Sequence, residues 1–141
     1  MNYYEVKVVY DKQTGEDNPG KVKEAYLVPA MTPSEAESIV LEEIKPFIFG
    51  DCEVPQIRKR LFFDIFKSAG GEFWYEAKVE MITVDGDSEV HKPVAMLVQE
   101  DTIHAALKEL KLKLGSYDHE IIQIKKSLIV DVIENPSNSG E

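Results

Sequence analysis

Three blocks of this sequence occur twice, in the same order along the chain. The pairs of blocks are residues 3–8 and 74–79, 25–28 and 95–98, and 56–66 and 123–133. The first pair reads Tyr-Tyr-Glu-Val-Lys-Val and Trp-Tyr-Glu-Ala-Lys-Val, and the third pair keeps Gln, Ile, Lys, Leu and Asp at matching positions. Such repetition is typical of a duplicated structural unit, which packs against its copy to bury its apolar face. We therefore expect two similar halves that share one core.

The start of each half predicts an antiparallel pair of strands. Apolar and polar residues alternate over residues 4–10, and they alternate again over residues 75–81. A period of two residues is typical of a strand with one buried face. In the second half Asp85-Gly86 then predicts a hairpin turn, and the polar residues 14–20 form the corresponding connection in the first half.

A helix and a closing strand complete each half. The segment Thr32-Pro33-Ser34-Glu35 combines a capping box with proline at the first helical position, so the first helix begins there. The second helix begins after Thr102 and ends at Gly115. Long closing strands follow at 56–66 and 121–133. Pro55, at the front of the first one, disfavours a central place in a sheet.

Together these elements predict an α+β fold, in which two internally duplicated ββαβ units pack as a pseudo-two-fold single domain. The first ββαβ repeat spans residues 1–67 and the second spans residues 72–133, with a flexible Ser-Ala-Gly-Gly segment between them. The tail, residues 134–141, is polar, and we expect it to be disordered.

Composition excludes several classes of site. The single cysteine, Cys52, cannot form a disulfide within the chain or a cysteine-cluster zinc site, and its acidic neighbours disfavour a thiolate nucleophile. The histidines lack metal-ligand spacing, and no glycine-rich loop leads into a helix to hold phosphate. No apolar run is long enough to cross a membrane, and the N-terminus lacks a secretion signal. We therefore expect a cytoplasmic protein with no cofactor, no metal and no catalytic residues.

One pair of carboxylates leaves an enzymatic alternative open. Asp64 and Asp131 occupy equivalent places late in the two closing strands, and a pseudo-two-fold axis could bring them together. Two close carboxylates can bind a divalent cation or separate their pKa values for acid–base chemistry. The preferred interpretation is that each carboxylate lies on an outward face and pairs with a lysine such as Lys7 or Lys78.

Aromatic and basic residues at matching positions of the two halves form the candidate binding site. Its members are Tyr3, Trp74, Arg58, Arg60, Lys125 and Lys126. The alternation puts Trp74 on the face of Glu76 and Lys78, so we expect an exposed ring. Aromatic rings beside a basic strand bind single-stranded nucleic acid by stacking on bases and attracting phosphates. Alternatively, the aromatic residues fill the seam between the halves, and the basic residues balance a surface whose net charge is −10.

Several blocks of the sequence resemble one family. They are Tyr4-Glu5-Val6-Lys7-Val8, Tyr26-Leu27-Val28, Ser34-Glu35-Ala36-Glu37, Trp74-Tyr75-Glu76-Ala77-Lys78-Val79, Met96-Leu97-Val98-Gln99 and Asp131-Val132. Over residues 2–133 the chain is similar to a family of uncharacterised proteins of Bacteroides-type bacteria and their tailed phages, including crAss-like phages. These motifs are structural, so the resemblance implies no site. It implies a phage or mobile-element setting, with a role in DNA replication or recombination or in disarming a host defence.

The sequence thus favours a non-enzymatic binding protein whose ligand is single-stranded DNA or a nucleotide. The alternative is a protein-interaction or counter-defence module that contacts a host or phage protein through its acidic surface. The closing strands are rich in Val, Ile and Phe and make good edges for pairing with another chain, so we also expect a homodimer.

Overall fold

The computed structural model describes residues 3–11, 20–48 and 50–134. Over these residues the fold is α+β, with two sheets and two α-helices, which confirms the predicted class. Residues 14–19 of the first connection and residues 135–141 of the tail lie outside the described residues. Neither described α-helix combines the length and the apolar composition that a membrane span needs.

The chain divides into two compact units that each contain one sheet and one α-helix. Unit 1 contains Met1–Leu61 and Leu128–Glu141, and unit 2 contains Phe62–Ser127. Unit 2 is therefore one continuous segment, whereas unit 1 is built from the two ends of the chain.

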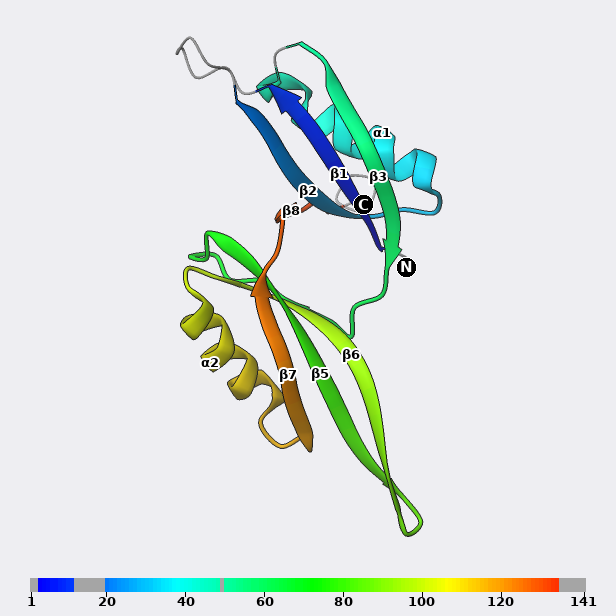
Figure 1. Ribbon diagram of the computed structural model, residues 1–141, viewed down its shortest axis with the longest axis vertical. Helices are drawn as coiled ribbons and strands as arrows, with labels where there is room; N and C mark the ends of the chain where they lie inside the picture. The colour runs from blue at the N-terminus through cyan, green and yellow to red at the C-terminus, as the bar shows by residue number, and fades with distance from the viewer. Residues whose placement is uncertain (1–2, 12–19, 49, 135–141) are drawn as a thin grey trace, which may run out of the picture. The chain divides into compact units, whose positions relative to one another are not determined.

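Unit 1 contains a four-stranded sheet, sheet 1, with strand order β3-β1-β2-β8. In chain order its elements are β1 (Tyr3–Asp11), β2 (Lys21–Pro29), α1 (Pro33–Ile44), the 3-10 helix η1 (Lys45–Phe47), β3 (Cys52–Arg60) and β8 (Ile129–Val132). Strand β8 runs parallel to β2, and the other neighbours are antiparallel. As Pro55 predicted, β3 is an edge strand (Figure 1). Its register with β1 shifts between Lys7 and Val9.

Unit 2 contains sheet 2, with strand order β4-β6-β5-β7. In chain order its elements are β4 (Asp64–Phe66), β5 (Phe73–Asp85), β6 (Ser88–Glu100), α2 (Ile103–Leu114) and β7 (His119–Lys126). The predicted hairpin turn is confirmed, because Asp85 pairs with Ser88 across a two-residue loop. Gly86 has a φ of 65° in this loop, a conformation that favours glycine.

The prediction of two unbroken closing strands is wrong. The chain leaves sheet 1 after β3 and forms β4 in sheet 2, and it leaves sheet 2 after β7 and forms β8 in sheet 1. Phe63 donates a backbone hydrogen bond to Ala95 of β6, and Ala25 of β2 donates one to Leu128. A period-two pattern continues through both pieces, so it cannot reveal that they belong to different sheets.

Both α-helices begin where their capping residues predicted, and α2 also ends where Gly115 predicted. Thr32 accepts a hydrogen bond from the Glu35 amide at 3.1 Å, and Thr102 accepts one from the Ala105 amide at 3.1 Å. These bonds satisfy amides that have no partner within the helix. Gly115 forms the C-cap of α2.

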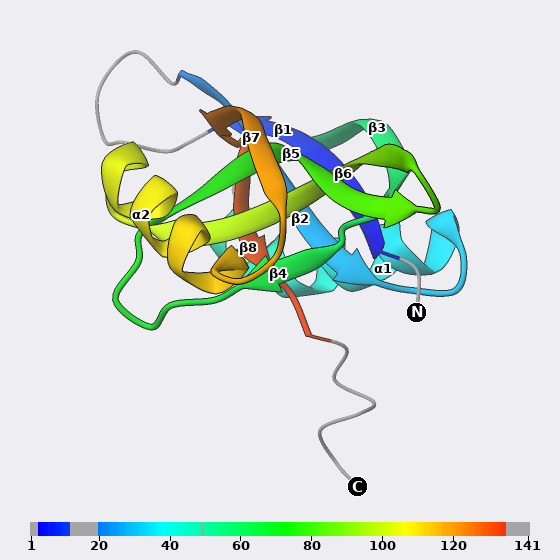
Figure 2. The ribbon, with the colours of Figure 1, turned by 90° about the horizontal axis from the view of Figure 1, so that it is seen from below.

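Each unit has its own hydrophobic cluster between its helix and its sheet, whereas we expected one core shared by the two halves. The buried helix residues are Ala36, Val40 and Ile44 in unit 1 and Ala106, Leu110 and Leu114 in unit 2. Figures 1 and 2 show each helix lying along one face of its own sheet, which we call the helix face. We call the opposite face of each sheet the second face. A duplication with a pseudo-two-fold axis remains a prediction.

Candidate functional site

The ring expected to stack on bases is buried. The side chain of Trp74 is 2% exposed, so the prediction of an exposed Trp74 is wrong. Leu97 belongs to the same second face of sheet 2 and is 0% exposed, so this face is not uniformly solvated. The Trp74 Nε1 atom has no hydrogen-bond partner among the described residues. Tyr3, the matching aromatic residue, is half-buried in unit 1.

The two arginines of the predicted site form ion pairs with a buried carboxylate. Arg60 Nη1 lies 2.6 Å from Glu5 Oε1, and Arg58 Nη2 lies 3.6 Å from Glu5 Oε2. The side chain of Glu5 is 6% exposed and that of Arg60 is 12% exposed, whereas that of Arg58 is 51% exposed. A buried carboxylate needs such partners, so the arginines stabilise unit 1 instead of presenting two free cations to phosphate.

The two predicted lysines lie at the end of β7 in unit 2. Lys126 Nζ is 3.5 Å from the centroid of the Phe73 ring, which is a cation–π contact. Lys125 is exposed and pairs in register with Glu76. The six predicted residues are therefore divided between the units, with Tyr3 and the arginines in unit 1 and the others in unit 2.

The two aspartates of the enzymatic alternative belong to different units, since Asp64 lies in β4 and Asp131 in β8. Each is exposed, and each accepts a hydrogen bond at 2.9 Å from the amide of the next residue. No group of three or more potential metal ligands occurs within the described ranges. Burial, followed by the charge of Glu53, raises the pKa of the Cys52 thiol, as its acidic neighbours predicted.

Three lysines line a groove in unit 1, which we call the lysine groove. It has a volume of about 740 Å³, and its lining includes Lys7, Lys21, Lys23, Glu53, Pro55 and Gln56. Val9 of β1 lies opposite both Lys23 of β2 and Glu53 of β3, so the groove follows the second face of sheet 1.

Lysines outnumber carboxylates in the groove, because three lysines line it together with Glu24 and Glu53. None of Lys7, Lys21 and Lys23 has a carboxylate within ion-pair distance among the described residues. Lys21 and Lys23 are two residues apart on one strand, which spaces their Cα atoms by about 6.6 Å. Glu24, also at the groove, accepts hydrogen bonds from the Tyr10 and Tyr26 hydroxyls at 2.9 and 3.1 Å.

Sheet 2 provides an internal comparison for the groove. Lys7 lies opposite Ala25 and Gln56, and Lys78 lies opposite Ala95 and Gln123 in the same way. The residue opposite Glu80 is Pro93, whereas the residue opposite Val9 in sheet 1 is Lys23. The second face of sheet 2 therefore lacks an equivalent of Lys23 within the described chain.

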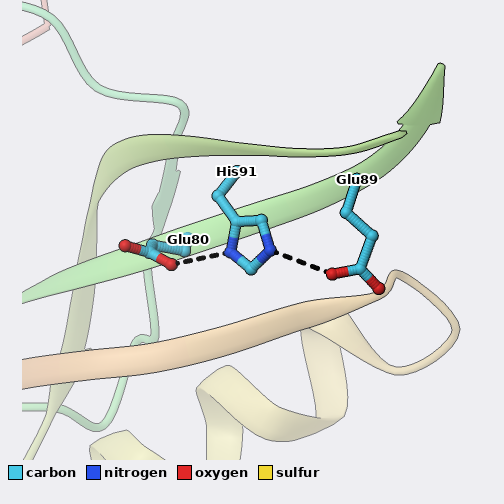
Figure 3. A network of polar contacts seen from close by, with 3 residues as sticks. All are labelled: Glu80, Glu89 and His91. Carbon is cyan, nitrogen blue, oxygen red and sulfur yellow. Dashed lines mark hydrogen bonds and ion pairs between the residues drawn. The ribbon is translucent and has the colours of Figure 1, made fainter. Parts of the chain in front are cut away.

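An acidic network replaces the lysines on the β5–β6 hairpin. His91 Nδ1 lies 3.0 Å from Glu80, and His91 Nε2 lies 3.2 Å from Glu89 (Figure 3). The hydrogen bonds to Glu80 and then to Glu89 raise the pKa of His91. The two second faces thus differ in charge, although their strands pair alike.

The lysine groove holds groups that can bind phosphate, although Glu24 and Glu53 also line it. Lysine side chains bind phosphate as point charges, and the amide of Gln56 adds a donor and an acceptor. Pro55 and Leu128 add apolar surface, but no aromatic residue of the described ranges lines the groove. Sequence reasoning missed this site, although the spacing of Lys21 and Lys23 places them on one face of a strand.

Comparison with known proteins identifies a family but no activity. No curated protein and no solved structure matches the chain at a significant level. Residues 2–135 match the family described as Domain of unknown function (DUF4494). Because this match covers nearly the whole chain, the protein belongs to the DUF4494 family.

Proposed function

We propose that this protein is a non-enzymatic binding protein of phage or mobile-element type that acts in the cytoplasm. Its ligand is single-stranded DNA or a nucleotide, and the phosphates of that ligand lie in the lysine groove. The observation that carries the proposal is that Lys7, Lys21 and Lys23 line one groove without carboxylate partners among the described residues.

The mode of binding is electrostatic. Phosphates release counterions when lysines neutralise them, and this release gives affinity without a stacked base. Trp74 is buried, and the described residues that line the groove include no aromatic side chain; both observations argue for phosphate recognition over stacking. The net charge of −10 opposes anion binding at long range, so the local charge of the groove has to dominate.

Salt dependence of oligonucleotide binding tests the proposal. Fluorescence anisotropy with a labelled single strand measures the association constant at several salt concentrations. For three lysine–phosphate contacts, the logarithm of this constant should fall with the logarithm of the salt concentration, with a slope of about −2. The variant Lys21→Gln/Lys23→Gln should bind more weakly, with a slope of about −0.7. The matched control Lys78→Gln/Lys125→Gln removes the same charge from unit 2 and should keep the parent slope.

Two outcomes would contradict this function: no binding at low salt, or an unchanged slope in the groove variant. Competition by an unlabelled nucleoside triphosphate separates the two ligands. Equal competition per phosphate identifies a nucleotide ligand, and much weaker competition identifies a longer strand.

The β5–β6 hairpin supports the alternative of a protein-interaction or counter-defence module. Beyond Met81, where pairing with β7 ends, the hairpin continues to Gly86 (Figure 1). Val84 is 72% exposed there, beside the acidic residues Asp85 and Glu89. This alternative predicts that a lysine-rich peptide binds the parent protein but not the Glu80→Gln/Glu89→Gln variant, which isothermal titration calorimetry can measure.

A further inference from the structure

Helices α1 and α2 have the same length and the same place in their units, but opposite charge. Each has twelve residues and begins after a threonine cap. The first carries four glutamates and no basic residue, whereas the second carries three lysines, one histidine and one glutamate. Pairs of opposite sign four residues apart stabilise a helix, and α2 has one such pair, Glu109 and Lys113, whereas α1 has no basic residue to form one.

The charges on the outward face of α1 are unpaired. Glu42 and Glu43 are exposed, and neither forms an ion pair among the described residues. Glu35 contributes to capping, because it accepts a hydrogen bond from the Met31 amide at 3.2 Å. Phe47 of η1 is 77% exposed, and the exposed Lys45 separates it from the end of α1.

The outward face of α2 has the complementary character. Lys113 pairs with Glu109 at 3.7 Å, which leaves Lys108 and Lys111 exposed and without an ion-pair partner in the described part of the chain. Leu112, between Lys111 and Lys113 in the sequence, is 68% exposed. An exposed leucine surrounded by charged side chains suits the centre of an interface with a polar rim.

We infer that the acidic face of α1 binds the basic face of α2 on a second copy of this chain. Two twelve-residue helices are each about 18 Å long, so the faces match in extent as well as in charge. The contact joins two different surfaces, so association is head-to-tail, and each copy keeps one free face for the next. This association uses helix faces, in place of the strand edges that the sequence suggested for a homodimer.

Sedimentation velocity of the full chain tests the association. At low salt the mean mass should rise with concentration above the 16.0 kDa of one chain. In 1 M salt the Debye length falls to about 3 Å, and the mass should return to that of one chain.

Two neutralising variants test the pairing of the faces. Glu42→Gln/Glu43→Gln should weaken self-association by about five- to thirtyfold, and so should Lys108→Gln/Lys111→Gln. Glutamine is a good helix former, so both variants should keep the circular dichroism spectrum of the parent. In an equimolar mixture, the basic face of α2 in the first variant can still bind the acidic face of α1 in the second. The mixture should therefore form a dimer that adds no further copies.

Control variants separate this contact from the proposed function. Lys7→Gln/Lys23→Gln in the lysine groove should leave the mass distribution unchanged, as should Lys92→Gln on the β5–β6 hairpin. Leu112→Ser should weaken association without unfolding α2, because its side chain is exposed.

Three results would overturn the inference. The first is a parent protein that stays monomeric at low salt, and the second is a mixture of the two variants that forms no dimer. The third is a Lys108→Gln/Lys111→Gln variant that loses oligonucleotide affinity while it associates like the parent, which would assign the basic face of α2 to nucleic acid.

Discussion

The pairing of Glu5 with two arginines predicts that burial decides the effect of removing each arginine. Arg60→Gln leaves Glu5, whose side chain is 6% exposed, without its 2.6 Å partner. Breaking a buried ion pair from one side costs about 3–5 kcal/mol of unfolding free energy. We expect a loss of about 3 kcal/mol, at the lower end, because Arg58 still lies 3.6 Å from the carboxylate.

Arg58→Gln is the matched control. Its guanidinium is 51% exposed and more distant from Glu5, so water screens the interaction, and the variant should lose less than about 1 kcal/mol. The double variant Glu5→Gln/Arg60→Gln removes the uncompensated charge. Its loss of unfolding free energy should therefore be about 2 kcal/mol smaller than the sum of the losses in Glu5→Gln and Arg60→Gln.

Urea denaturation followed by far-ultraviolet circular dichroism measures these differences. The unfolding midpoint of Arg60→Gln should shift to a lower urea concentration. The slope of the unfolding free energy against urea concentration should stay constant, because the surface exposed on unfolding is unchanged. Equal losses in the two arginine variants, or additive effects in the double variant, would refute the reasoning that the buried carboxylate sets the magnitude.

Three further predictions concern the second unit. Leu110→Ala should cost about 2–5 kcal/mol in urea denaturation, because the side chain is 0% exposed, while Leu112→Ala at 68% exposure should change stability by less than about 0.5 kcal/mol. Gly71→Ala places a Cβ 2.8 Å from the backbone of β6, so the free energy of unfolding should fall by about 1–3 kcal/mol, which a lower melting temperature would reveal. The pKa of His91, followed by nuclear magnetic resonance, should lie above 6.5 in the parent and fall in Glu80→Gln. Since folding raises this pKa, the contact stabilises the hairpin fully below the unfolded pKa, and its contribution is lost as pH rises through the folded pKa.

Local features of the fold were predictable from sequence because they depend on adjacent residues. A threonine cap satisfies amides within the same turn, and the Asp85-Gly86 turn needs only a glycine with positive φ, so Thr32, Thr102 and Gly86 could be assigned from the sequence. Alternation likewise identified the strands, because it reports the buried face of each one.

The burial of Trp74 was not predictable from alternation, which assumes one buried face and one solvated face. In the structure Glu5 and Leu27 on the second face of sheet 1 are buried, as are Trp74 and Leu97 on that of sheet 2. Alternation describes which residues share a face but gives no information about whether water reaches it.

The candidate site depended on pairings that are distant in sequence. Arg60 and Glu5 are 55 residues apart, so nothing local shows that a carboxylate holds this arginine. The lysine groove combines β1, β2 and β3, and its three lysines meet through strand register alone. Sequence spacing could place Lys21 and Lys23 on one face, but it could not place Lys7 beside them.

The exchange of strands between the sheets constrains the order in which the protein can be completed during synthesis. All strands of unit 2 leave the ribosome before β8, so the edge of β2 stays unpaired until the C-terminal strand is made. An unpaired edge is a template for incorrect strand pairing. For the same reason, cleavage within residues 68–71 yields no intact unit, since the first fragment lacks β8 and the second lacks β4. The continuous segment that contains a complete sheet and its helix is instead Phe62–Ser127, which begins and ends inside the sequence repeats.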